Sequence, residues 1–137
     1  MCVLRLSGPH QKLSASVSNS FIEFREAIAS QKDRESGKTT EGESSTYLYS
    51  VSNADNDHVP TQISDAVNFL TQRQTELKEL LSRDGVEQAI LDFAWDFPLD
   101  ALGQFNRFPL SLIDLCAKLG IEIEVSVYGT STEKKQK

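Results

Sequence analysis

The sequence predicts an α/β (α+β) fold of two layers, in which a mixed β-sheet carries its helices mainly on one face. Three observations predict this fold. Residues 60–85 repeat apolar side chains at helical spacing, residues 86–95 and 121–128 alternate with a period of two, and a short helical pattern at residues 109–119 separates the two alternating segments. A strand, a helix and a second strand in this order form a C-terminal βαβ unit, so we expect the two strands to be parallel.

Residues 60–85 are expected to form one long amphipathic helix. Its apolar stripe is Ile63, Ala66, Val67, Leu70, Leu77, Leu80 and Leu81. Thr61, which follows Pro60, suits the N-cap position, and Arg83 with Gly85 supplies the stop signal.

The C-terminal βαβ unit has clear apolar faces. The first strand places one set of residues on a common face: Val86, Ala89, Leu91, Phe93 and Trp95. In the helix, which Pro109 opens and Gly120 closes, the inward residues are expected to be Leu112, Ile113, Cys116 and Leu119. The last strand alternates buried Ile121, Ile123, Val125 and Val127 with solvated Glu122, Glu124, Ser126 and Tyr128.

The N-terminal half has weaker patterns. Residues 2–7 predict a first strand that ends at Gly8 and Pro9, and residues 47–51 predict another. Residues 21–28 fit a short helix or a strand, and both interpretations stay open at this point.

Two polar segments are expected to lack regular structure. Residues 30–45 contain no large apolar side chain, so nothing offsets the entropy of ordering them, and we expect a mobile loop. The tail at residues 129–137 is expected to be disordered. A single domain therefore spans residues 1–128.

The composition indicates a soluble cytoplasmic protein. The net charge of −6 makes the surface repel phosphate backbones and anionic lipid, which argues against nucleic acid and membrane as partners. The mean hydropathy of −0.35 does not fit a membrane span, and the apolar run at the N-terminus is too short for a secretory signal. Cys2 and Cys116 are expected to be buried free thiols, although a disulfide or a nucleophile is the alternative.

Several segments carry a resemblance to a known family. They are CVLRLSG near the N-terminus, then VSNADNDHVPTQISDAVNFLTQRQTELKELL, GVEQAILDFAW and FPLSLIDLCAKLGIEIEVSVYG. In these segments the chain resembles small bacterial proteins related to the family called domain of unknown function 4279. The resemblance implies a compact α/β domain that ends in a helix and a strand closing on Tyr128, and it implies no activity. Family members usually place a strand with a basic, Gly-containing turn after the first helical segment; here FIEFREAIAS leads into the polar loop, and the comparison favours a strand at residues 21–26.

No catalytic motif is present, and we predict no catalytic residue, metal site or cofactor. Asp55, Asp57 and His58 lie close together before the long helix and offer ligand types that a cation takes. The same residues also favour a turn and a helix entry, and we prefer this structural explanation.

Two groups of residues are candidate binding sites. Trp95, Asp96 and Arg107 belong to the connection after the first strand of the βαβ unit, where ligands of open sheets tend to bind. The second group, Glu122, Glu124 and Tyr128, belongs to the sheet face that the helices leave uncovered.

Three hypotheses about function follow. The first is a non-catalytic binding or interaction protein, immunity-like in that it masks a partner protein of complementary charge. The second is a small ligand-binding protein or enzyme that uses residues 95–107. The third is self-association through the open sheet face. The sequence identifies no partner.

Overall fold

The computed structural model describes residues 1–27 and 44–130. Within these residues one five-stranded sheet has the strand order β2-β3-β1-β4-β5. The strands are β1 (Cys2–Pro9), β2 (Arg25–Glu26), β3 (Ser44–Ser52), β4 (Gln88–Pro98) and β5 (Glu122–Thr130). The helices among the described residues are α1 (His10–Ser18), α3 (Val59–Gln72), α4 (Gln74–Leu81) and α5 (Leu110–Leu119).

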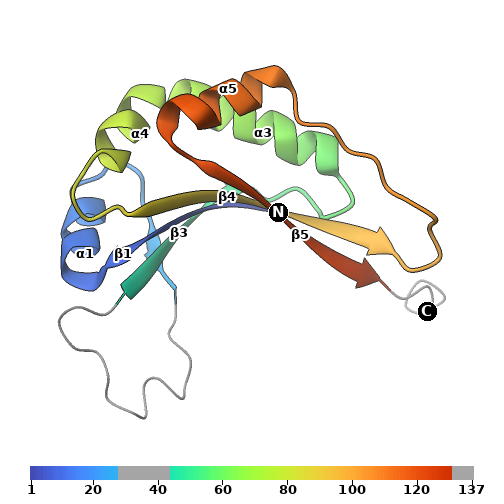
Figure 1. Ribbon diagram of the computed structural model, residues 1–137, viewed down its shortest axis with the longest axis horizontal. Coiled ribbons are helices and arrows are strands. Elements are labelled where there is room, and N and C mark those ends of the chain that lie inside the picture. The colour runs from blue at the N-terminus through green and yellow to red at the C-terminus, as the bar shows by residue number, and fades with distance from the viewer. Residues whose placement is uncertain (28–43, 131–137) are drawn as a thin grey trace, which may run out of the picture.

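The topology confirms the predicted α+β fold with a mixed sheet. β1 pairs antiparallel with β3 on one side and β4 on the other, and β5 pairs parallel with β4. Because α5 lies between β4 and β5 in the chain, these three elements form the predicted βαβ unit. α3, α4 and α5 cover one face of a curved sheet, and α1 lies at one end of the sheet (Figure 1). None of the described helices covers the opposite face, which we call the open face.

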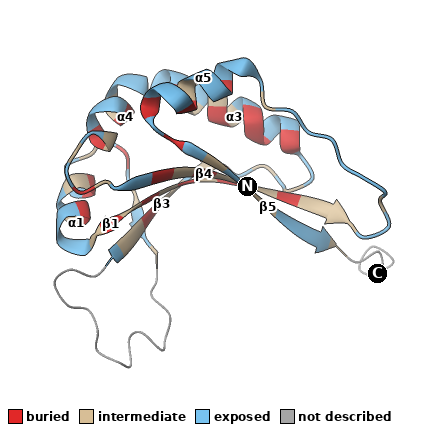
Figure 2. Cartoon of the chain, in the orientation of Figure 1, coloured by how far each residue is buried: buried red, intermediate tan, exposed pale blue. Residues whose placement is uncertain are grey.

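The core lies between the sheet and the three covering helices. Alternate residues of β1 and β4 point into it, including the fully buried Leu4, Leu91 and Phe93, while Leu70 and Leu112 enter from α3 and α5. Figure 2 shows the buried residues of the helices on the side that faces the sheet. This arrangement follows directly from a period of two in the strands and a period of 3.6 in the helices.

The single long helix predicted for residues 60–85 is wrong in detail, because the structure has two helices. α3 begins at Val59, so Thr61 is not the N-cap, and the helical conformation is interrupted at Arg73, where φ is −106° and ψ is 15°. Residues 71–76 include no apolar side chain that would hold a straight helix against the sheet. α4 ends at Leu81, before the predicted stop signal.

The structure also settles the N-terminal half. α1 was not predicted, although Leu13 and Val17 have the i, i+4 spacing of a helix and are both buried. Of residues 21–27, the described part of the ambiguous segment 21–28, only Arg25–Glu26 forms a strand, paired with β3.

The two segments predicted to lack structure are corrected where the structure describes them. Ser44 and Ser45 begin β3, and Gly129 and Thr130 end β5, because their backbones pair with neighbouring strands. Residues 30–43 and 131–137 lie outside the described residues.

Burial along the βαβ unit is less complete than predicted. Ile121, just before β5, is buried, and Ile123 and Val125 in β5 are half-buried. Val127 is 55% exposed, because β5 is the edge of the sheet and no strand lies beyond it among the described residues. In α5, Ile113 is 46% exposed instead of pointing inward.

The described helices include none with both the length and the apolar content needed to cross a bilayer.

Candidate functional site

The connection from β4 to α5 exposes an unusual amount of apolar surface. Phe105 is 97% exposed and Leu102 is fully exposed. Together with exposed neighbours at the two ends of the connection they form what we call the connection surface: Leu99, Leu102, Phe105, Leu110 and Ile113. Leu110 and Ile113 also line a shallow hollow of about 590 Å³ along α5. The connection runs along the outside of the molecule from the end of β4 to the start of α5 (Figure 1).

The connection is attached to the domain at both ends. Near β4, the backbone N–H of Leu99 donates to the carbonyl of Thr130 at 3.2 Å, and the amide of Gln104 donates to the carbonyl of Asp96 at 2.9 Å. Near α5, the Phe108 ring packs on the Trp95 ring with a centroid distance of 5.6 Å. Phe108 therefore serves the core, whereas the exposed side chains between these anchors do not.

Trp95 lies at the base of the connection with a polar atom unsatisfied. Its ring packs against Phe93 and Phe108, which also contact each other, and the residue is only 7% exposed. The indole Nε1 is buried and has no hydrogen-bond partner within the part of the chain that the structure describes. Most buried donors are paired, so this N–H is a free donor for an acceptor group of a ligand.

The first predicted site, Trp95 with Asp96 and Arg107, does not assemble as one group. Trp95 and Asp96 are consecutive residues of a strand, so their side chains point to opposite faces. Asp96 lines a shallow hollow of about 440 Å³ with Met1 and residues 53–57, and Arg107 is not among its lining residues. Arg107 lies exposed on the connection.

The N-terminal amine helps to shape that hollow. It donates to the carbonyl of Ala54 at 2.6 Å and to the Asn56 side chain at 2.9 Å. Desolvation lowers the pKa of the amine, against the opposing effects of nearby anionic groups. The residues that line the hollow, Met1, residues 53–57 and Asp96, are mainly polar or acidic.

The second predicted group does assemble on the open face. Glu122, Glu124 and Tyr128 occupy alternate positions of β5, and the strand register sets Tyr128 beside Asp96 of β4. Their side chains lie on the face that no described helix covers.

A polar network crosses the open face. Arg5 of β1 donates to Asp92 of β4 at 3.2 Å and to Glu124 of β5 at 2.8 Å, and the hydroxyl of Ser126 donates to the other oxygen of Asp92 at 2.8 Å. The hydrogen bond to Glu124 is the main reason that the pKa of Arg5 is raised. Glu122 receives a 3.4 Å hydrogen bond from the neutral amide of Gln88. Glu124 is thus paired with a cation within the domain, and the contact to Gln88 leaves the charge of Glu122 in place.

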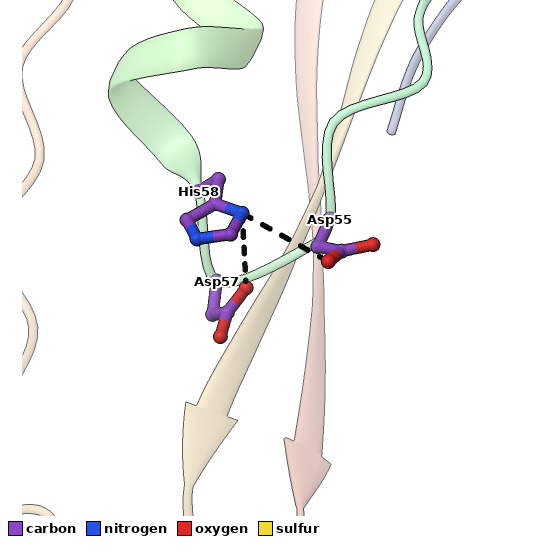
Figure 3. Close-up of side chains that lie close together, drawn as sticks. All are labelled: Asp55, Asp57 and His58. Atoms are coloured by element: carbon purple, nitrogen blue, oxygen red, sulfur yellow. Dashed lines mark ion pairs between the residues drawn. The ribbon is translucent and has the colours of Figure 1, made fainter.

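Asp55, Asp57 and His58 form the cluster that the sequence indicated, just before α3 (Figure 3). His58 Nδ1 lies 3.6 Å from a carboxylate oxygen of Asp57 and 3.9 Å from one of Asp55. All three side chains are exposed, and the backbone N–H of His58 donates to the carbonyl of Asp55 at 2.9 Å. These contacts fit the turn that was preferred from the sequence.

The connection surface is the feature that sequence analysis missed. The only signal is the run ALGQFNRFPL, which contains large apolar residues without a strand or helix period. Such a run does not indicate which of its side chains are buried, because Phe105 and Phe108 differ only in their tertiary contacts.

No family model matches the sequence, and no curated protein or solved structure shows significant similarity to it. The resemblance to the family called domain of unknown function 4279 therefore stays a prediction.

Proposed function

We propose that this chain is a non-catalytic protein-binding module of the cytoplasm, immunity-like in that it masks a basic partner protein. The observation that carries the proposal is the exposure of Leu102 and Phe105 on a connection that is attached at both ends. Burial of one such side chain stabilises by about 2 kcal/mol, so leaving both in water gives up stability that the fold itself does not recover.

A partner recovers that free energy by receiving the two side chains in an apolar pocket. Protein interfaces concentrate their binding energy in a few large side chains near the centre, surrounded by polar groups. Leu102 and Phe105 suit the centre, and Leu110 and Ile113 extend the apolar area along α5.

The charge of the chain supports a basic partner. The net charge is −6, and Asp96 lies near the end of the connection that follows β4. Complementary charge increases the rate of association and excludes acidic partners. Both cysteines are free, which fits a reducing cytoplasm.

Quantitative capture from a lysate of the source cell tests the proposal. The wild type is compared with the double variant Leu102→Ser, Phe105→Ser and with the control Phe21→Ser. Phe21 is 86% exposed and precedes β2, at the other edge of the sheet from β5, so the control removes a similar apolar group elsewhere. We expect a basic protein that the wild type and the control retain and the double variant loses.

The captured protein is then purified and titrated calorimetrically. We expect binding to the wild type that weakens at least tenfold in the double variant. Equal capture by all three proteins, or a partner that binds the double variant as tightly, contradicts the proposal.

The alternative function, ligand binding or catalysis by residues 95–107, has one observation in its favour: the unpaired Nε1 of Trp95. Trp95 is the only tryptophan, so a ligand that accepts this hydrogen bond is expected to change the fluorescence of the protein. A library of small carboxylates and amides that leaves the fluorescence unchanged argues against this alternative.

A further inference from the structure

The two edges of the described sheet differ in length. β2 has two residues at one edge, whereas β5 has nine at the other. A long edge strand presents unpaired backbone N–H and C=O groups, and proteins usually block such an edge with Pro, Lys or a bulge. β5 contains neither Pro nor Lys, its two charged residues, Glu122 and Glu124, lie on the open face rather than on the apolar side, and its register with β4 is continuous from Glu122 to Thr130. Among residues 1–27 and 44–130 no strand lies beyond β5, so in this part of the chain the edge is open to another strand.

We infer that a second copy of this chain pairs with β5 in antiparallel orientation, about a two-fold axis at Val125. The two sheets then form one continuous sheet. This dimer is independent of the connection surface, so the inference goes beyond the proposed function.

The apolar side of β5 is self-complementary in this arrangement. Val125 lies opposite the Val125 of the second copy, and Ile123 lies opposite its Val127. Val127 is 55% exposed in the single chain although it occupies the face that the helices cover, and Val125 and Ile123 are half-buried. The second copy removes the apolar surface of all three from water, which favours association.

The charged side of β5 favours the antiparallel over the parallel orientation of the second copy. The arrangement sets Glu122 opposite the Tyr128 of the second copy, and Glu124 opposite its Ser126. Parallel in-register pairing would instead set each glutamate against its own copy, and like charges directly opposite each other are destabilising. Glu124 already pairs with Arg5 of its own chain at 2.8 Å, so it needs no cation from the partner.

Cross-linking of two single variants, Glu122→Cys and Tyr128→Cys, tests the register. Both positions are exposed, and the native Cys2 and Cys116 are buried, so only the introduced thiols are expected to react. Residues directly opposite on antiparallel strands have Cα atoms about 4.5–5.5 Å apart, within the range of a disulfide. We expect a disulfide-linked dimer of one variant with the other when the two are mixed, and none in either variant alone.

The molar mass from light scattering tests the dimer itself. We expect twice the 15.3 kDa of one chain for the wild type. Val127→Lys is expected to give one chain, because a charged edge residue would face the apolar row of the partner, while thermal unfolding checks that this variant is folded. The control Phe105→Lys is expected to remain a dimer but to lose binding of the basic partner protein. Failure of the dimer and failure of the proposed function are therefore distinguishable.

Three results would overturn the inference. They are a single-chain mass for the wild type at high concentration, a dimer that survives Val127→Lys, and a disulfide that forms within either unmixed cysteine variant.

Discussion

At the scale of single residues, buried polar groups show what the core requires. Gln62 of α3 is fully buried, and its amide donates to the carbonyls of Asp55 and Ala94 at 3.0 Å each. It thereby ties the turn before α3 to β4, which a leucine at this position of the apolar stripe could not do. A sequence pattern treats such a glutamine as a surface residue.

The buried thiols make stability depend on pH. Burial raises the pKa of Cys116 from 9.0 to about 11, and it raises the pKa of Cys2 as well. The folded state holds the thiol protons more tightly than the unfolded state. The contribution of the protonated thiols to stability is therefore fully present below pH 9 and is lost as the pH rises toward 11.

Between pH 9 and pH 11 we expect the free energy of unfolding to fall more for the wild type than for Cys116→Ala. The expected difference is about 2 kcal/mol, because one pKa unit corresponds to about 1.36 kcal/mol. Urea unfolding followed by Trp95 fluorescence measures both proteins, and other groups that titrate in this range affect them alike. Parallel pH profiles would show that the Cys116 thiol ionises as freely in the folded chain as in the unfolded one.

Arg5 and Glu124 are expected to stabilise the open face measurably. Their ion pair spans β1 to β5 at 2.8 Å and shares the guanidinium with Asp92, which is only partly exposed. A double-mutant cycle with Arg5→Met and Glu124→Gln should give a coupling of about 0.5–1 kcal/mol. The more exposed pair Lys12–Asp84 is the control, with a coupling near zero. Equal couplings for the two pairs would contradict a special role of Arg5.

At the scale of elements, close backbone approach fixes how α1 meets the turn before β4. A Cβ on Gly85 would collide with the backbone of Lys12 and Leu13, and a Cβ on Gly8 would collide with the carbonyl of Gly85. The side chain of Arg83 also donates to the carbonyl of Ser16 in α1. The predicted role of Gly85 was to stop a helix, but the structure uses its lack of a side chain for packing.

Gly85→Ala is therefore expected to destabilise the protein by about 2 kcal/mol or more, since backbone must move to make room. Gly103→Ala is the control, because its Cβ would lie 3.4 Å from the Phe105 ring, and its change should stay within about 0.5 kcal/mol. Chemical denaturation gives both values, and a similar small loss for both variants would contradict the tight contact.

At the scale of the whole molecule, charge restricts the partners. With 20 acidic and 14 basic residues, the average surface repels a nucleic-acid backbone, and the central Arg5 of the open face is neutralised by its two carboxylates.

We expect no retardation of duplex DNA or RNA in gel shifts at about 0.15 M salt, where non-specific binders have Kd values of about 10⁻⁴ to 10⁻⁶ M. A basic protein of similar size serves as the positive control for the assay. Retardation that salt abolishes would reveal a basic surface that the overall charge conceals.

The sequence by itself determined the α+β class, the parallel pair joined by a helix and the uncovered face of β5. These features follow from local periodicity, since a strand or helix that buries one face must repeat its apolar residues at the matching interval. Glu122, Glu124 and Tyr128 were predictable as a group for the same reason.

Only the tertiary structure decided which residues of non-periodic segments meet. It kept Arg107 apart from Asp96, and it packed the half-buried Phe108 on Trp95 while leaving Phe105 exposed. Each of these outcomes depends on contacts between segments far apart in the chain, and such contacts leave no regular spacing in the sequence. The position of β5 at the edge of the sheet was also decided only by the tertiary structure, because the packing of the whole domain sets the order of the strands.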